Sequence, residues 1–433
     1  MESIAQKLGM MRNEPEWVIS LRMEAEKYLK TAPFPSEIKP LDLESYDPLG
    51  KPDVDIPEIK SLDDIPENIR KMLLAMGVPE YEWQKILGLV QVDTSSQVTS
   101  FKDYFEKQGV VVLSLLDAIK RFDWLRDYAF RLMPYKDNKI AAYHTAYWNG
   151  GIFLWIKKGA KIAYPLHTYF LITEGALAQA DHALIIADEG AEATFIEGCT
   201  APPLLRFSAH IGATEVYVKK GAKVKGIVLQ NWPPYVNTRP YTNVHVEEGG
   251  EIEVAVAILG NGKSAGRYEE VHLKGRGAKA SIHSISFVKE KEHLDDVIKI
   301  YLEAEDTHGL IQTKGVIRDN GISNSYTHIE ASEHACYSKG HIECSGLLLN
   351  PGAKHTTYPG VRSVSPSSEL THEAYVGRVS EESLTYMMSR GLSEEDAISL
   401  LIKGYIEPVT KHIPFEYLKE VQRIAELVAK GGF

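Results

Sequence analysis

The chain has 433 residues, of which 44% are hydrophobic and 25% charged, and its 48 basic and 59 acidic residues give a formal net charge of −11. This acidic balance is a poor match for nucleic acid or for anionic membrane surfaces, and no apolar run approaches the ~18 residues of a membrane span. The first residues contain no apolar signal core, and three cysteines do not make a disulfide framework, so we expect reduced thiols in the cytoplasm.

Residues 1–135 are predicted to form a helical region that a proline-rich linker interrupts. Asn13 can cap a helix whose first turn accepts Pro15, and apolar residues then recur at helical spacing as far as Tyr28. Residues 32–66 hold a third of the 21 prolines, which favours an extended linker or strap over a packed core. A helix-like apolar periodicity returns over residues 67–132.

From about residue 138, short β-rich runs alternate with glycine turns flanked by charged residues. The first glycine of each turn recurs at steps of 31, 31, 28 and 28 residues, at Gly159, Gly190, Gly221, Gly249 and Gly277. A fixed step of this size is typical of stacked repeats. We therefore predict a mainly β fold with a β-helix, or solenoid, over residues 136–375. The alternative is a β-sandwich, whose turns would usually recur every 8–12 residues.

The C-terminal residues 376–433 are again predicted to be helical. One helix covers residues 381–390 and ends at Gly391. Ser393 and Asp396 make a capping box for a second helix, which is predicted to end at Gly404, and Pro414 opens a third, amphipathic one. An apolar helix pair outside a finished solenoid is either a lid on its open end or a docking surface.

The densest chemical segment runs from residue 328 to residue 372. It contains five of the 15 histidines and two of the three cysteines, namely His328, His334, Cys336, His341, Cys344, His355 and His372. Imidazole and thiolate bind zinc and the iron of iron–sulfur clusters, although the spacing is not that of a zinc finger. Ordinary surface or strand histidines remain the alternative.

Cys199 stands apart in the segment FIEGCTAPP at 195–203. It is either a buried small hydrophobic residue or an accessible thiol that accepts sulfur, and nearby Glu197 would raise the pKa of the thiol. Residues 257–264 (AILGNGKS) match a relaxed phosphate-loop pattern, but a β-repeat follows where such a loop requires a helix. We therefore expect no ATP binding there.

Several long segments together resemble the SufB/SufD family, the core proteins of the SUF iron–sulfur cluster assembly machinery. They are residues 187–203 (ADEGAEATFIEGCTAPP), 218–234 (VKKGAKVKGIVLQNWPP) and 371–406 (from THEAYVGRVS to LLIKGYI). Residues 13–25 (NEPEWVISLRMEA) resemble the start of the SufB branch. The resemblance implies a right-handed parallel β-helix between helical terminal regions, which agrees with the repeat pattern.

The resemblance also implies a function and a set of partners. SufB-like proteins are assembly scaffolds rather than enzymes. They form a complex with a second copy or a SufD-like subunit, and with SufC, an ABC-type ATPase that docks on the C-terminal helices. Sulfur arrives from a donor protein as persulfide, and a transient iron–sulfur cluster forms at the subunit interface. A reduced flavin is a further candidate component, whereas nucleic acid and membranes are not expected partners.

Family positions transfer to this sequence residue by residue. Cys344 in HIECSGLLL matches the cluster-site thiolate, His372 the histidine near the interface, and Glu373 the carboxylate after it. Glu343 and His355 are further candidates for iron ligation.

Cys199 matches the cysteine that receives sulfur. Gln230 and Trp232, in LQNW, match positions that line the path between the two thiols.

The sequence departs from the family pattern at four other positions. Thr371 replaces the glutamate before the HEA motif, and Ala353 replaces a second cysteine. Leu171 and Thr173 replace an arginine and an asparagine of the sulfur path. Two other readings stay open: a structural β-helix subunit with incidental cysteines and histidines, and a carbohydrate-active β-helix enzyme such as a polysaccharide lyase.

Overall fold

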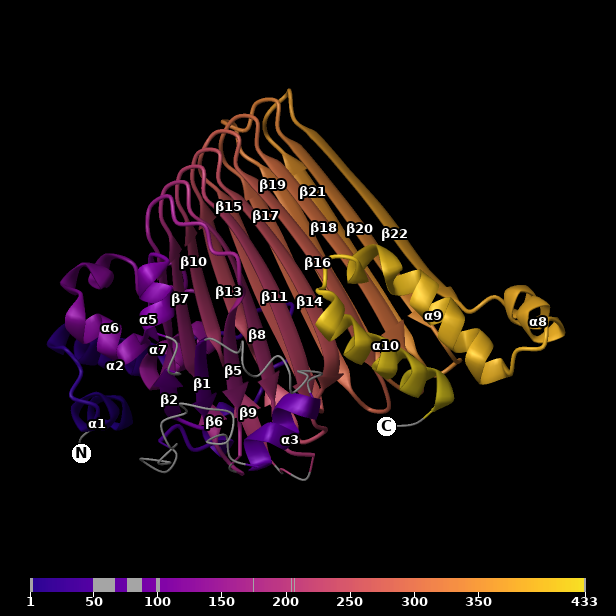
Figure 1. The fold of residues 1–433 in the computed structure, drawn as a ribbon, viewed down its shortest axis with the longest axis horizontal. Helices are drawn as coiled ribbons and strands as arrows, with labels where there is room; N and C mark the ends of the chain where they lie inside the picture. The colour runs from indigo at the N-terminus through magenta and orange to yellow at the C-terminus, as the bar shows by residue number, and fades with distance from the viewer. Residues whose placement is uncertain are drawn as a thin grey trace.

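The structure, a computed structural model, describes residues 3–49, 67–75, 88–98, 102–173, 175–203, 205 and 207–431. It is mainly β, with 42% strand and 25% helix, and its parallel β-solenoid of about 8 turns has helices at both ends. Figure 1 shows the strands stacked side by side, the N-terminal helices at one end, and α8 (Glu381–Ser389) projecting beyond the other. The predicted β-helix between helical regions is confirmed.

Two long sheets form the solenoid. The ten-stranded sheet has the order β2 (Ser95–Val98), β1 (Gly88–Val92), β5 (Leu166–Leu171), β8 (Glu192–Thr200), β11 (Lys223–Trp232), β14 (Glu251–Asn261), β16 (Lys279–Val288), β18 (His308–Ile317), β20 (Lys339–Leu348) and β22 (Glu369–Arg378). The twelve-stranded sheet has the order β21 (Lys354–Ser363), β19 (Ile322–Ala331), β17 (His293–Leu302), β15 (Ser264–Leu273), β13 (Tyr241–Val246), β10 (Ala213–Val218), β7 (Asp181–Ala187), β4 (Gly150–Ile156) and β3 (Val110–Ser114), with β6 (Ala178–Gln179), β9 (Ser208–His210) and β12 (Val236–Thr238) beside it.

The two sheets face each other across a narrow interior, here called the lumen. Successive residues of a strand point to opposite faces, so every second residue enters the lumen. Because neighbouring strands pair in parallel and in register, equivalent residues stack in rows along the solenoid axis. One such row is apolar throughout and runs through Val254, Ile282, Ile311 and Ile342. These β-branched rows supply the main hydrophobic core.

The corners between sheets explain the glycine spacing. Gly159, Gly190, Gly221, Gly249 and Gly277 all adopt left-handed backbone, with φ between 62° and 71°. An added Cβ would meet no atom within 4 Å at any of them, so backbone conformation rather than space selects glycine. Asp306 (φ 57°) and Tyr337 (φ 60°) continue the series without glycine, which is why the sequence pattern stops short of these turns.

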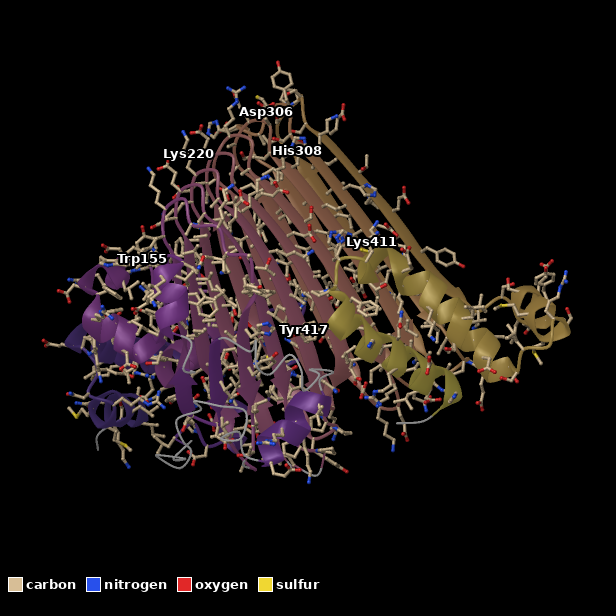
Figure 2. All side chains as sticks on the ribbon, in the orientation of Figure 1. Trp155, Lys220, Asp306, His308, Lys411 and Tyr417 are labelled. Atoms are coloured by element: carbon tan, nitrogen blue, oxygen red, sulfur yellow. The ribbon has the colours of Figure 1, made fainter. Side chains whose placement is uncertain are left out.

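Charged side chains line this edge of turns, and Figure 2 labels Lys220 and Asp306 among them. Lys220 pairs with Glu248 of the next turn at 3.0 Å, and Arg276 pairs with Asp306 at 3.0 Å. Such exposed pairs each contribute little stability. Their regular placement instead favours one alignment of neighbouring turns.

The N-terminal region combines helices with three strands. Its helices are α1 (Ile4–Met11), α2 (Glu16–Leu29), η1 (Leu43–Ser45), α3 (Glu67–Ala75), α5 (Lys102–Lys107), α6 (Leu115–Arg121), η3 (Asp123–Asp127) and α7 (Lys139–Tyr147). The helix from residue 16 is confirmed, although Pro15 is its N-cap and Asn13 lies in a left-handed turn before it. The helix prediction for 67–132 is wrong for β1, β2 and β3. These strands extend the two sheets, because β1 pairs with β5 and β3 pairs with β4.

The described part of the proline-rich segment is a strap along the twelve-stranded sheet. Ile38 and Tyr46 are buried in the cluster that contains Tyr241 and Tyr268 of that sheet. The Lys39 backbone N–H donates to Asp295 at 2.8 Å. Extended chain thus packs against the solenoid, as the prolines predict, whereas residues 50–66 lie outside the described ranges.

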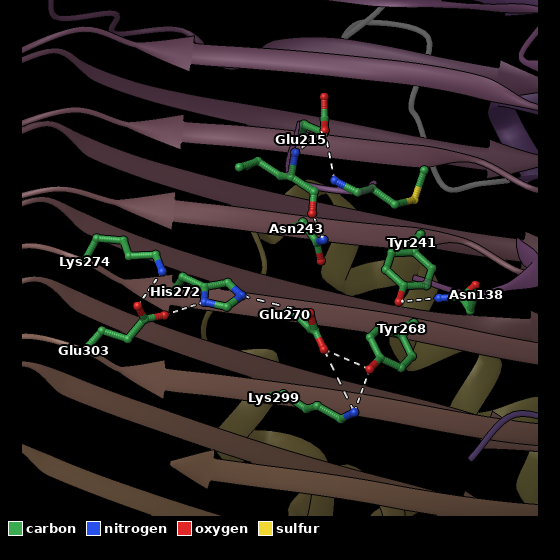
Figure 3. Close-up of polar contacts among 12 residues, drawn as sticks. Asn138, Glu215, Tyr241, Asn243, Tyr268, Glu270, His272, Lys274, Lys299 and Glu303 are labelled. Atoms are coloured by element: carbon green, nitrogen blue, oxygen red, sulfur yellow. Dashed lines mark hydrogen bonds and ion pairs between the residues drawn. The ribbon is translucent and has the colours of Figure 1, made fainter. Parts of the chain in front are cut away.

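Polar contacts hold residues 130–138 to the twelve-stranded sheet, and Figure 3 shows several of them. Glu215 on β10 accepts hydrogen bonds from the backbone N–H groups of Phe130, Leu132 and Met133. The Asn138 amide donates to the Tyr241 hydroxyl at 3.0 Å. The N-terminal region is therefore fixed to the start of the solenoid through specific buried contacts.

The C-terminal helices α9 (Glu394–Thr410) and α10 (Phe415–Lys430) cover the outer face of the ten-stranded sheet (Figure 1). Ser393 caps α9 as predicted. The predicted end at Gly404 is wrong, because α9 continues through Pro408 to Thr410. Burial of Ile406 and Val409 on the sheet outweighs the backbone hydrogen bond that proline removes.

The helix pair is thus not a lid on the end of the solenoid. Beyond it, α8 has no buried residue. No helix among the described residues is both long enough and apolar enough to cross a membrane.

Candidate functional site

Cys199 lies on β8 with its side chain in the lumen and no exposure to solvent. Its neighbours in register are Phe170 on β5 and Gln230 on β11. The surroundings are nevertheless polar, because Glu197 precedes it by two residues and faces the same side. The Cys199 thiol points at Glu197 Oε1 with an S···O distance of 3.7 Å.

This setting controls the acidity of both groups. Burial raises the pKa of the Cys199 thiol well above its ordinary value, and the Glu197 and Asp181 carboxylates raise it further. The sequence-based expectation for Glu197 is therefore confirmed. Burial also raises the pKa of Glu197 itself to about 7. At neutral pH the thiol keeps its proton, whereas the carboxyl group exchanges its proton readily.

Gln230 and Trp232 lie near this thiol, and both are buried. Gln230 is the partner of Cys199 across the β8–β11 pairing. The Trp232 ring lies 4.8 Å from the ring of His210, centroid to centroid. The structure therefore brings three of the predicted sulfur-handling residues into one neighbourhood.

Cys344 lies on β20, also inside the lumen, and is 1% exposed. Its Sγ is 3.1 Å from the Thr327 hydroxyl on β19 of the opposite sheet. Thr313 on β18 is its register neighbour on the preceding turn. Among the described residues, this thiol therefore has two hydroxyl neighbours and no carboxylate contact, unlike Cys199.

One row of lumen residues connects the two thiol sites. It starts beside Cys199 and consists of Glu197, Val228, Val256, Ser284, Thr313 and Cys344. Five strand spacings of about 4.8 Å place its ends about 24 Å apart. The two predicted sulfur-binding cysteines thus share one interior, although they are too far apart for direct transfer.

Two histidines lie near the Cys344 end of the lumen. His372 on β22 is the register partner of the lumen residue Ile342, so it lies on the lumen side, but no further turn covers it and it is exposed. The His355 ring lies against Gly346 and Gly315, where a Cβ would crowd it. Both His355 ring nitrogens are buried without a hydrogen-bond partner, and burial lowers the pKa of this histidine to about 4.

The two glutamates predicted for the same site lie on the other face. Glu343 and Glu373 are register partners and point outward, because they alternate with Cys344 and His372. Glu343 accepts a hydrogen bond from Gln312 at 2.6 Å and pairs with Lys314 at 3.0 Å. The fold therefore places both carboxylates on the face opposite to the Cys344 thiol.

The dense histidine–cysteine segment is not one cluster in space. His341 lies on the outer face and contacts Thr371, whereas Cys336 lies in the turn before β20. Within the described ranges, no group of three or more His, Cys, Asp or Glu side chains is arranged to hold a metal ion.

The phosphate-loop pattern at 257–264 is a strand followed by a turn. β14 continues to Asn261, Gly262 adopts φ 61°, and β15 begins at Ser264. The sequence predicts a β-repeat after this segment, where a phosphate-binding loop requires a helix, and the strand β15 confirms that repeat.

Comparison with known proteins identifies the family. The family model "SUF system FeS cluster assembly, SufBD core domain" matches residues 170–405, more than half of the chain. An iron–sulfur cluster assembly SufBD family protein of Pyrococcus horikoshii is 39% identical over 437 aligned positions, covering 100% of this chain and 97% of the relative. The chain belongs to the SufBD family.

A SufBD family protein of Staphylococcus epidermidis is 33% identical and covers 100% of this chain and 93% of its own length, and one of Staphylococcus aureus has the same values. Membership gives this SufBD chain a role in iron–sulfur cluster assembly, and family members are assembly components.

Sequence reasoning missed a set of polar lumen residues between the two thiols. They are Arg267, Glu269, Ser284, Asp296, Thr313, Ser325 and Thr327. Each is an ordinary strand residue in the sequence. Apart from the pair Arg267 and Glu269, which are two residues apart, their contacts join residues 12 to 29 positions apart. Only the register of the turns brings them together. Their single sequence signal is polarity at alternating strand positions that should be apolar.

Proposed function

We propose that this SufBD chain is a scaffold subunit that accepts sulfur at Cys199 and holds a nascent iron–sulfur cluster at Cys344, between two subunits. The observation that carries the proposal is the continuous row of lumen residues from Glu197, beside Cys199, to Cys344. The cluster is the cargo of this chain.

A polar column beside that row supports sulfur passage through the lumen. Its contacts are Arg267 with Asp296 at 2.7 Å, Ser284 with Asp296 at 3.2 Å, Thr313 with Ser325 at 3.3 Å, and Thr327 with Cys344 at 3.1 Å. Polar groups in an apolar interior are costly, which favours a functional reason for them. Hydroxyl and guanidinium donors can stabilise an anionic sulfur species that moves along the column. Gln230 and Trp232 line its beginning.

The open end of the solenoid supports cluster assembly between two subunits. The last strands of the two sheets, β21 and β22, have no further strand beside them in the described part of the chain. Their exposed apolar side chains are Tyr358, Val361, Tyr375 and Val376. A long, unpaired and partly apolar edge is a ready surface for another chain. A second copy or a SufD-like subunit would cover this edge and complete the iron ligands around Cys344, His372 and His355.

The two outward glutamates are less direct candidates. Glu373 could reach a partner across the same edge, whereas Glu343 is already engaged by Gln312 and Lys314. We therefore rank Glu343 below Cys344, His372 and His355 as an iron ligand.

A sulfur donor protein would load Cys199, and a reduced flavin in the complex would supply electrons.

The C-terminal helices support docking of a SufC-type ABC ATPase. Tyr386 and Met388 on α8, and Leu392 after it, are exposed apolar residues. On α9, the Tyr405 hydroxyl donates to Ser345 at 2.9 Å, and Ser345 follows Cys344 directly. Lys314 lies over the Tyr405 ring and also pairs with Glu343. Movement of α9 by the ATPase would therefore act on the strand that carries the cluster thiol.

Anaerobic reconstitution of the chain with its co-expressed ATPase tests the scaffold function. We expect stoichiometric iron and acid-labile sulfide in the wild type, and loss of both in Cys344→Ala. Cys336→Ala is the matched control, because this third thiol lies in a turn and should leave loading unchanged. Equal loading of wild type and Cys344→Ala would remove Cys344 from the proposal.

Two further outcomes would select the other readings. If Cys344→Ala leaves complex assembly and cellular iron–sulfur enzyme activities intact, the chain is a structural subunit. Cleavage of a uronate polymer with calcium would instead indicate a carbohydrate-active enzyme.

A further inference from the structure

A small cavity in the lumen lies beside Cys199. Its volume is about 30 Å³, and residues of both sheets line it, among them Asp181, Glu197, His210, Gln230, Arg267 and Glu269. This is enough room for a water molecule, or for one group of similar size. Glu197 therefore both lines this cavity and contacts the Cys199 thiol.

The charges around this cavity are unbalanced. Asp181, Glu197 and Glu269 bring three carboxyl groups to it, whereas Arg267 is its single arginine or lysine side chain among the lining residues described. Arg267 is already engaged, with Asp296 at 2.7 Å and Glu269 at 3.1 Å. No lysine or arginine forms an ion pair with Glu197 in the described part of the chain. Three carboxylates this close would repel one another, so the cavity is suited to storing and exchanging protons.

Unpartnered polar atoms point to an occupant of the cavity. Arg267 is 5% exposed and Glu269 is 2% exposed, yet Arg267 Nη2 and Glu269 Oε1 have no hydrogen-bond partner among the described residues. Buried polar atoms are nearly always satisfied, by protein or by ordered water. A water in the cavity would join Glu197 to these groups.

We propose, resting on the function proposed above, that Glu197 is the proton acceptor that activates Cys199 for sulfur transfer. The geometry that supports this role is the 3.7 Å contact from Cys199 Sγ to Glu197 Oε1, together with the cavity that Glu197 lines and through which its proton can pass. Thr214 lines the same cavity as Glu197. A buried thiol whose pKa is raised needs such a base, because only the thiolate is nucleophilic.

The reaction balances without an added oxidant or reductant. The Cys199 thiol gives its proton to the Glu197 carboxylate, and the thiolate forms a bond to the outer sulfur of a donor persulfide, R–S–SH. The bond between the two donor sulfurs breaks, and R–S⁻ leaves with that electron pair. Glu197 returns the proton to this thiolate through the cavity. The net change is R–S–SH plus Cys199–SH to R–SH plus Cys199–S–SH.

The groups around Glu197 determine how the reaction depends on pH. Besides Cys199 on its own strand, they are Asp181 on β7, His210 on β9, and Arg267 and Glu269 on β15. His210 is neutral, because burial lowers its pKa to about 3. Glu269 raises the pKa of Glu197, so the variant Glu269→Gln should shift the acidic limb of the rate profile to lower pH.

The test uses the full-length chain and inorganic polysulfide as the sulfur donor. Persulfidation of the Cys199 peptide is measured by alkylation and mass spectrometry between about pH 5.5 and pH 9.5, a range that includes neutrality and the ordinary pKa of a thiol. We expect Glu197→Gln to slow the reaction about 10²-fold at neutral pH, the low end for loss of a general base. The deficit should shrink at alkaline pH, where hydroxide removes the thiol proton.

Two controls separate a base from a structural residue. Glu192→Gln changes an exposed carboxyl group on the same strand, paired with Lys161, and should leave the rate unchanged. Glu197→Asp keeps a carboxyl group and should recover part of the rate, whereas a residue needed only for packing would not be rescued this way. Thermal melting of each variant confirms that the chain is folded.

The outcomes distinguish this inference from the function on which it rests. Equal rates for folded Glu197→Gln and wild type at every pH would overturn the inference and leave sulfur acceptance standing. The same holds if Glu197→Gln is unfolded and Glu269→Gln leaves the pH profile where it was. A wild-type chain in which Cys199 takes no sulfur would overturn the proposed sulfur acceptance, and this inference with it.

Discussion

The two lumen thiols occupy opposite kinds of surroundings. Cys199 lies deep in the solenoid beside a small cavity with three carboxyl groups, whereas Cys344 lies one turn from an open edge beside hydroxyl groups. The first setting favours the protonated thiol and needs a base, as inferred for Glu197. The second leaves ligand positions for a partner chain to fill. The same β-helix thus provides two chemistries through the depth at which each thiol is placed.

Charges placed at the open edge should have the largest effect. The double change Val361→Asp and Val376→Asp puts carboxylates on β21 and β22, where we propose the second subunit binds. Unpaired buried charges at an interface cost about 2–5 kcal/mol, so association should weaken by tenfold or more. Analytical ultracentrifugation measures this, with Met23→Asp, at an exposed position of α2, as the control. Unchanged association would show that the subunits meet elsewhere.

Closing the lumen midway should separate the two thiols chemically. Ser284→Leu replaces a 1% exposed hydroxyl on the connecting row with a larger apolar side chain. Overpacking of this kind costs about 1–3 kcal/mol, so the chain should still fold. Labelled sulfur should then reach Cys199 but not Cys344, as read by mass spectrometry of both peptides. Ser281→Leu, on the outer face of the same strand, should leave transfer unchanged, and arrival at Cys344 in Ser284→Leu would contradict a lumen route.

Ionisation of Glu197 beside the cavity should also make the stability of the chain depend on pH. The pKa of Glu197 is about 7 in the folded chain against an ordinary value of 4.5, so the folded state binds this proton more tightly. Stability therefore falls as pH rises from about 4.5 to 7 and stays reduced above that, by at most about 3 kcal/mol. Glu197→Gln cannot ionise, so its stability relative to wild type should increase between pH 5 and pH 8. Denaturant unfolding at both pH values measures this difference.

Glu253, on the outer face, gives the opposite sign as a control. Although burial raises its pKa, bonds from Lys225 and His412 lower it overall. Glu253 therefore contributes stability that is present above its ordinary pKa and lost as the pH falls below it. Glu253→Gln should be less stable than wild type at pH 8, and the gap should narrow in acid. If the stability of Glu197→Gln and that of Glu253→Gln, each relative to wild type, changed in the same direction with pH, the contrast between the cavity and the outer face would be wrong.

The smallest effect is expected at the contact between α9 and the cluster strand. Tyr405→Phe removes the hydrogen bond to Ser345, worth about 1 kcal/mol. Cross-linking of Cys344 between two subunits should then respond less to ATP hydrolysis by the docked ATPase. Tyr164→Phe, at an exposed tyrosine in the loop before β5, is the matched control. If ATP leaves the wild-type cross-linking unchanged, the proposed gating fails altogether.

The repeat pattern in the sequence predicts most of the fold because corner geometry is local. Each left-handed corner selects glycine through its own φ, and the series therefore appears as a fixed step. The pattern fails where Asp306 and Tyr337 accept the same backbone conformation, and where β1, β2 and β3 borrow strand partners from the solenoid.

The candidate site is harder to predict because register creates it. Glu197 and Cys199 are two residues apart, and their contact follows from strand alternation alone. Thr327 and Cys344 are 17 residues apart on different sheets, and the length of one particular turn decides that they meet. The same alternation separates Glu343 from Cys344, although the two are adjacent in sequence.

Stacking in register makes the solenoid a ruler with discrete marks. Every turn adds one strand spacing, about 4.8 Å, between Cys199 and Cys344 and leaves both side chains on the inner side. Insertion or deletion of a whole turn would therefore change the travel distance in fixed increments and preserve the chemistry at each end. A single inserted residue in a strand would instead turn a thiol to the outside. The strands between these cysteines can thus change only by complete turns, whereas the connecting loops can differ by a few residues, as the steps of 28 and 31 residues show.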